Sequence, residues 1–200
     1  MATDTDGTRV PGYEIAEPFF ARWSPRAFTT EDISERTLLG LFEAARWAPS
    51  AMNAQPWRFV YARRGSPVFE KLLSALVPAN QAWAGKASAL VAILSARTMR
   101  LPGKDEALPS ASHSFDAGAA WAQMALQAHL WGWSTHAMGG FDREIVRQVL
   151  AVPGDHVIEV VVAVGKRGDS STLPEWAKSR EKPNDRLPLS TLVREGQFSP

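Results

Sequence analysis

The sequence contains no cysteine among its 200 residues. This absence excludes disulfide bonds, thiol nucleophiles and thiolate metal ligands, and it fits a reducing compartment. Long apolar runs are also missing: the longest, around 87–94 and 157–164, are far shorter than the roughly 20 residues of a membrane span. The N-terminus has no apolar segment of signal-peptide length. We therefore expect a soluble, cytoplasmic protein.

An excess of charge of either sign is absent as well. The chain has 22 basic and 21 acidic residues, a net charge of +1. Such a balance gives no broad field that would attract nucleic acid or an anionic membrane. The length and a hydrophobic content of 45% predict a single domain over 1–200. Within it we expect an N-terminal segment at 1–19 and a C-terminal arm at 169–200, which contains four prolines.

The common catalytic motifs are missing too. The sequence has no G-x-S-x-G elbow, no H-E-x-x-H, no Walker loop and no G-x-G-x-x-G. The four histidines lie in unlike contexts, which favours satisfied or exposed polar roles over catalysis. No carboxylate cluster has the spacing of metal ligands, so no metal site is expected. The protein side chains thus offer no catalytic group.

Hydrophobic periodicity predicts interleaved helices and strands. Helices are expected at 30–47, 67–77, 115–132 and 141–151, and strands at 57–62, 87–95 and 156–165. The stretch Arg97–Ser114, rich in Pro, Gly, Ser and charge, is predicted to be a long loop, either functional or mobile. The spacing is too irregular for a repeated βαβ fold.

One short stretch near the N-terminus suits phosphate. "RWSPRAF" places Arg22, Ser24 and Arg26 at alternate positions. In an extended segment, alternate side chains point the same way. Two guanidinium groups and a hydroxyl on one side would bind a phosphate monoester. The alternative is a solvated loop with ordinary surface arginines.

A second stretch, "APSAMNAQPW", places two amides in a stiff turn. Asn53 and Gln55 lie at alternate positions between Pro49 and Pro56. Side-chain amides both donate and accept hydrogen bonds, so they can read the edge of a flat heterocycle such as an isoalloxazine ring. The alternative is that Asn53 satisfies backbone groups in the turn.

Four blocks together resemble the FMN-dependent nitroreductase family. They are "RWSPRAF", "EAARWAPSAMNAQPWRF", "THAMGGFD" and "DRLPLSTLV", in matching order and spacing, and the resemblance runs from about Phe20 to Val193. It implies an α+β fold, a three-layer α/β/α sandwich with a central, mostly antiparallel sheet. It also implies an intertwined homodimer in which the C-terminal arm reaches the partner subunit. One FMN would lie at each of two sites on the dimer interface.

The resemblance also implies the residues at the cofactor. They are Arg22, Ser24, Arg26, Ser50, Asn53, Gln55, Met138, Gly139, Gly140 and Arg186. The first three and the last would hold the phosphate and ribityl chain, and the three in the turn would lie at the ring, with Ser50 coming from the partner subunit. The remaining three would pass their backbone over the ring and give an N–H to flavin N5.

The chain departs from the family at two of these places. Many relatives carry a glutamate where this chain has Gly139; a backbone contact survives that change, but a role of the acid in substrate choice does not. Some relatives carry a lysine where this chain has Asn184, which would leave one phosphate charge missing.

The activity implied is that of an NAD(P)H oxidoreductase. FMN would be bound, NAD(P)H would be the co-substrate, and a hydride would pass through flavin N5 in a ping-pong cycle to a small electron-poor acceptor such as a nitroaromatic, a quinone or an enone. A protein of the same fold that sequesters FMN without turnover is the alternative, and a flavin-degrading or dehalogenating enzyme is a third. The Arg97–Ser114 loop, with Trp83, is a candidate substrate lid; an ordered surface excursion is equally open.

Overall fold

A computed structural model describes residues 9–100 and 103–197. The strands are β1 (Trp57–Arg63), β2 (Ala89–Ala96), β3 (Thr98–Arg100), β4 (Ala107–Pro109), β5 (Ser134–Met138) and β6 (His156–Gly165). The helices are α1 (Glu17–Ala21), α2 (Glu35–Arg46), α3 (Pro67–Ala75), α4 (Pro78–Ala84), α5 (His113–Leu130), α6 (Arg143–Val149), α7 (Glu175–Lys178) and α8 (Leu189–Leu192), with 3-10 turns η1 (Ala51–Asn53) and η2 (Ser170–Thr172). Within these described ranges no helix is both long and apolar enough to cross a membrane.

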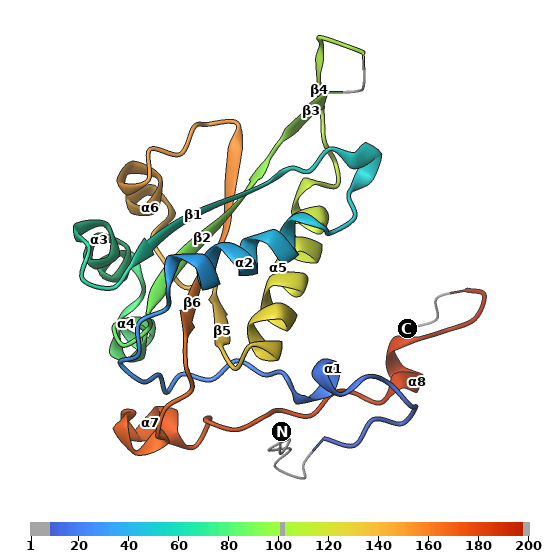
Figure 1. Cartoon of the computed structure of the whole chain (residues 1–200). Helices are drawn as coiled ribbons and strands as arrows, with labels where there is room; N and C mark the ends of the chain where they lie inside the picture. The colour runs from blue at the N-terminus through green and yellow to red at the C-terminus, as the bar shows by residue number, and fades with distance from the viewer. Residues whose placement is uncertain (1–8, 101–102, 198–200) are drawn as a thin grey trace.

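Four strands form the central sheet, in the order β1-β2-β6-β5, and every neighbouring pair is antiparallel. Helices cover both faces (Figure 1). On β2, Leu90 and Ala92 join a core cluster with α3, α4 and α6, whereas Val91 and Ile93 join a second cluster with α2 and α5. Successive strand side chains point to opposite faces, so a strand buried on both sides reads as one apolar run. The expected α+β, three-layer sandwich is confirmed.

Several boundaries differ from those expected. The first long helix begins at Glu35 rather than near Thr30, because Ser34 caps it: its Oγ accepts from the N–H of Thr37 at 3.0 Å. The helix expected at 67–77 ends at Ala75, and Pro78 then opens the unpredicted α4. Strand β5 was also not predicted.

The end of α5 follows the expectation for Gly132. This glycine has a φ of +73°, the left-handed conformation that glycine adopts at little cost. The N–H of Trp133 donates to the carbonyl of Ala128 at 2.8 Å, and that of Gly132 to His129 at 3.0 Å. This pair of bonds is a Schellman motif, which terminates the helix.

The stretch 97–114 is not a plain loop. Thr98 pairs with Pro109 in a β3–β4 hairpin that projects from the body of the molecule, and α5 already begins at His113 (Figure 1). Residues 101–102 lie outside the described residues. Trp83 is only 2% exposed, in the core under α4, far from the hairpin in Figure 1. The expectation that it forms a substrate wall with this stretch is wrong.

The C-terminal segment begins on the chain's own core. Leu173 and Ala177 are buried in the cluster that contains α3 and α4. The segment then runs beside the N-terminal one, with the Arg9 Nε donating to the Asn184 carbonyl at 2.7 Å (Figure 1). It ends in α8, where Leu189 and Leu192 are exposed. Whether α8 reaches a partner subunit stays a prediction.

Two glycines allow residues 27–29 to lie against the end of β6. The N–H of Thr29 donates to Lys166 at 2.9 Å, and that of Gly168 to Ala27 at 2.8 Å. A Cβ on Gly168 would lie 2.8 Å from the carbonyl carbon of Phe28. The contact is with backbone, which cannot rotate away. This glycine therefore fixes the segment that follows Arg26.

We expect Gly168→Ala to lower the free energy of unfolding by about 1–3 kcal/mol, because an added methyl must push two backbone segments apart. Urea denaturation of the variant and the wild type measures this difference. Gly154→Ala is the matched control, since a methyl added there would have no other atom within 4 Å; a change below about 0.5 kcal/mol is expected there. Equal stability of the two variants would contradict the close approach.

Candidate functional site

A cavity of about 180 Å³ gathers positive charge. Its lining residues are Arg9, Arg22, Trp23, Ser24, Arg26, His136, Arg180, Lys182, Asn184 and Arg186. The six cations come from the N-terminal segment, the "RWSPR" stretch and the C-terminal segment. Within the described ranges none of them forms an ion pair with a carboxylate; the lysine and arginine pairs found there involve other residues.

The cations of this cavity repel one another. Burial lowers the pKa of Arg22, and the nearby charge of Arg186 lowers it further. Burial likewise lowers the pKa of Arg9, with Arg186 and Arg22 adding to the effect. A partly buried group of like charges without a counter-charge disfavours the charged forms. An anion in the cavity would remove that penalty.

The alternation argued for "RWSPR" holds. Arg22 is extended (φ −61°, ψ 128°), and Arg22, Ser24 and Arg26 all line this cavity. Arg186 joins them from the far end of the chain. The expectation that Asn184 leaves the site one charge short is wrong, because Arg9, Arg180 and Lys182 add three cations.

A second cavity, of about 420 Å³, adjoins the first. Arg22, Ser24 and His136 line both. The rest of its wall is mainly apolar and comes from α1, α5 and β5: Phe19, Trp121, Ala122, Ala125, Leu126 and Ala137. The two cavities together suit a ligand with an anionic end and a flat, largely apolar body.

His136 stands where the two cavities meet. Its Nδ1 lies 3.0 Å from the Pro25 carbonyl, which can only accept, so Nδ1 carries a proton. The ring packs on Trp83 with centroids 4.6 Å apart. Burial lowers the pKa of His136, and the Arg26 charge adds to this against the raising effect of the Pro25 carbonyl. Sequence reasoning passed over this histidine because nothing near it in the chain marks it.

The chain after β5 presents backbone rather than side chains. Met138 is buried in the core. The carbonyl of Gly140 accepts from the N–H of Val77 at 3.0 Å and from Asn80 Nδ2 at 3.1 Å, and a Cβ here would lie 2.9 Å from a Val77 methyl. Gly139 has open space around it. In the part of the chain that the structure describes, the N–H groups of both glycines have no acceptor.

The turn at 50–55 is left-handed at three residues. Met52, Asn53 and Gln55 have φ of 52°, 54° and 48°, which is unusual for residues other than glycine. The expectation that Asn53 and Gln55 point the same way assumed extended backbone, and that assumption is wrong. Strained backbone of this kind is concentrated at functional sites.

Two of the turn's side chains brace it from inside. Gln55 Nε2 donates to the Asn53 carbonyl at 3.1 Å, and the Ser50 Oγ accepts from the N–H of Gln55 at 3.0 Å. The Asn53 amide, by contrast, makes no hydrogen bond to the residues that the structure describes. The alternative in which Asn53 satisfies the turn's backbone therefore has no support, and its amide is available to a ligand.

A buried acid, which the sequence did not single out, holds the turn against α5. Asp116 is 3% exposed, and its Oδ2 accepts from the N–H of Ala51 at 3.3 Å and from the Ser112 hydroxyl at 3.0 Å. This bond fixes the turn to the first residues of α5.

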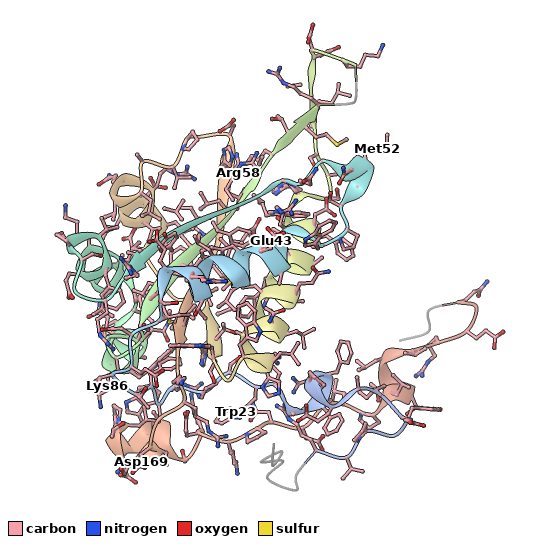
Figure 2. The ribbon with its side chains drawn as sticks, viewed as in Figure 1. Trp23, Glu43, Met52, Arg58, Lys86 and Asp169 are labelled. Carbon is pink, nitrogen blue, oxygen red and sulfur yellow. The ribbon has the colours of Figure 1, made fainter. Side chains whose placement is uncertain are left out.

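One chain does not bring the turn and the cationic cavity together. Asp116 is ten residues before Leu126, about 15 Å along the helix, and the cationic cavity lies beyond the Leu126 end. Figure 2 shows Met52 and Trp23 well apart on the molecule. The predicted cofactor residues thus form two separate groups, with Asn53 in one and Arg22 in the other. In the described ranges no group of three or more possible metal ligands occurs.

Comparison with known proteins gives consistent matches. The model of the nitroreductase family matches residues 20–166. The NADH dehydrogenase of Thermus thermophilus is 27% identical over 199 residues, which covers 86% of this chain and 91% of the relative. A crystal structure described as an oxidoreductase containing FMN is similar with a TM-score of 0.91 at 42% identity, over 96% of each chain. A nitroreductase family protein from Streptococcus pneumoniae TIGR4 is alike in fold, with a TM-score of 0.72 at 19% identity, over 90% of this chain and 98% of that one.

Proposed function

Because this chain belongs to the nitroreductase family, we propose that it is an FMN-dependent NAD(P)H oxidoreductase that reduces small electron-poor acceptors. Nitroaromatics, quinones and enones are the classes of acceptor that we propose. The observation that carries the proposal is the cluster of six cations, without carboxylate partners in the described ranges, that opens into an apolar-walled cavity.

The residues present fit FMN. Guanidinium groups bind phosphate through paired N–H donors, so Arg22, Arg26 and Arg186 would hold the phosphate monoester. Ser24 and His136, which line both cavities, lie where the ribityl chain would connect phosphate to ring. The free N–H of Gly139 offers a donor to the ring. The chemistry of the donor set therefore matches a flavin with an anionic phosphate.

The chain's own part in the reaction is to bind and orient. When bound, FMN supplies the redox chemistry, taking a hydride from NAD(P)H and passing two electrons to the acceptor. Trp121 and Ala125 on α5 would shield one side of the site from water, and the cations fix the phosphate end. Burial keeps His136 neutral, so it adds no charge where the two cavities meet.

We further propose that the working unit is a homodimer. The split of the predicted cofactor residues supports it, since a second copy can place its Asn53 turn beside the first copy's cationic cavity. Large apolar side chains on the surface support it too: Trp47 is 71% exposed, Phe115 82% and Phe19 64%. Phe19 lies at the rim of the apolar cavity itself.

The first test is the flavin spectrum of the purified protein. We expect bound flavin, released as FMN on denaturation, whose absorbance near its visible maximum is lost when NADPH or NADH is added anaerobically, because a hydride acceptor lies within reach of the dinucleotide. The more effective donor shows the cofactor preference. Bound FMN that neither donor reduces would favour FMN sequestration over turnover. Protein that takes up no FMN would overturn the proposal.

A further inference from the structure

Arg9 joins three segments of the chain at the phosphate site. It lies before the part matched by the family model, residues 20–166. Its Nη1 donates to the carbonyls of Phe20 at 3.0 Å and Arg22 at 2.9 Å, and its Nε donates to the carbonyl of Asn184 at 2.7 Å. One guanidinium thus ties the N-terminal segment, the start of "RWSPR" and the C-terminal segment together.

A carboxylate makes a second connection a few residues away. Glu181 accepts from the backbone N–H of Arg26 at 2.8 and 2.9 Å and from that of Ala27 at 2.8 Å. Glu181 and Asn184 are three residues apart on the C-terminal segment, as Arg22 and Arg26 are four apart on the other. The two segments are therefore held at both ends, and the cationic cavity lies along them.

Arg9 holds its end although the neighbouring charges oppose it. Arg186 and Arg22 both disfavour its charge, and only Asp185 among the nearby charged groups favours it. The three carbonyl bonds keep it there, since an ionised donor makes stronger hydrogen bonds than a neutral one. Its Nη2 makes no hydrogen bond to the residues described in the structure, so two donors remain for the cavity that Arg9 lines.

We propose that Arg9 is a positioning residue of the FMN phosphate site, which holds Arg22 and Arg186 on the same cavity by tying their two segments together. The inference rests on the proposed FMN function. It predicts an effect confined to the phosphate: riboflavin, which has the same ring and ribityl chain without the phosphate, should bind regardless of Arg9.

The test is titration of flavin-free protein with FMN and with riboflavin, followed by flavin fluorescence. We expect Arg9→Gln to raise the FMN dissociation constant by about tenfold or more, the loss of one charge-assisted contact, and to leave that of riboflavin within about twofold. Arg36→Gln is the control: it removes an arginine from the exposed surface of α2, and both constants should stay at the wild-type values. An unchanged FMN constant in Arg9→Gln, or an equal loss for both flavins, would overturn the inference.

Arg9→Lys separates position from charge. Lysine keeps the positive charge, but a compact ammonium cannot reproduce the planar fork that reaches three carbonyls. We expect FMN binding by this variant to remain weaker than wild type, with riboflavin unaffected. Full recovery of the FMN affinity would show that Arg9 contributes only charge, and the positioning role would fall.

The wild-type protein separates this inference from the proposed function. If it binds FMN no more tightly than riboflavin, the phosphate site, and with it the proposed cofactor, is wrong. If it prefers FMN and Arg9→Gln keeps the whole preference, only the role of Arg9 is wrong.

Discussion

Replacing Arg22 by alanine should weaken FMN binding by about ten- to a hundredfold without destabilising the cofactor-free protein. The lost contact is a charge-assisted hydrogen bond to phosphate, typically about 1.5–3 kcal/mol. In the free protein the same guanidinium has only a 3.5 Å contact with the Ser24 hydroxyl, and burial and Arg186 both lower its pKa. Removing a partly buried, unpaired cation relieves repulsion, so we expect the free energy of unfolding to stay the same or rise.

Arg64→Ala is the matched control, with the opposite expectation. Its guanidinium donates to the carbonyls of Lys86 at 2.9 Å and Thr30 at 2.6 Å and pairs with Asp32, away from the cationic cavity. Its loss should lower stability and leave FMN affinity unchanged. Flavin titration and urea denaturation of flavin-free protein measure both quantities for both variants. If Arg22→Ala lowers stability and not affinity, Arg22 is a structural residue.

The same physical arguments explain which parts of the fold could be predicted. Strands β2 and β6 are buried on both faces, so their apolar runs stand out in the sequence. Strand β5 is five residues long and mixes Thr135 and His136 with apolar side chains, so no periodicity marks it. The β3–β4 hairpin pairs only three residues on each strand, and turn-rich composition conceals it.

Prediction of the site depended on the local backbone. The alternation argument succeeds for Arg22, Ser24 and Arg26 because that stretch is extended. It fails for Asn53 and Gln55 because both have positive φ, a conformation that a residue other than glycine does not announce. The turn is held in it by tertiary contacts, the Asp116 carboxylate among them.

Residues outside the motifs could not have been found from the sequence. Arg9, Arg180 and Lys182 stand among other surface cations, and nothing in their spacing links them to "RWSPR". Only the folded chain brings residues more than 150 positions apart onto one cavity, as the bond from Arg26 Nη1 to the Arg180 carbonyl shows. The resemblance supplied Arg186 for the same reason: it preserved a three-dimensional contact that a single sequence does not contain.

Mixed dimers should show that each flavin site needs two chains. We expect Arg26→Ala and Asn53→Ala each to weaken FMN binding at every site when the variant is alone. A dimer with one chain of each type should recover about half of the sites at wild-type affinity, because a two-fold axis pairs the intact Arg26 of one chain with the intact Asn53 of the other.

The split site determines the outcome of that experiment. If Arg26 and Asn53 of one chain served the same flavin, each chain of the mixed dimer would carry a damaged site and no tight binding would return. Two differently tagged chains, purified through both tags and titrated with FMN, distinguish the cases by stoichiometry rather than by rate. The position of Asn53 at the start of α5, with the cationic cavity beyond the other end, favours recovery.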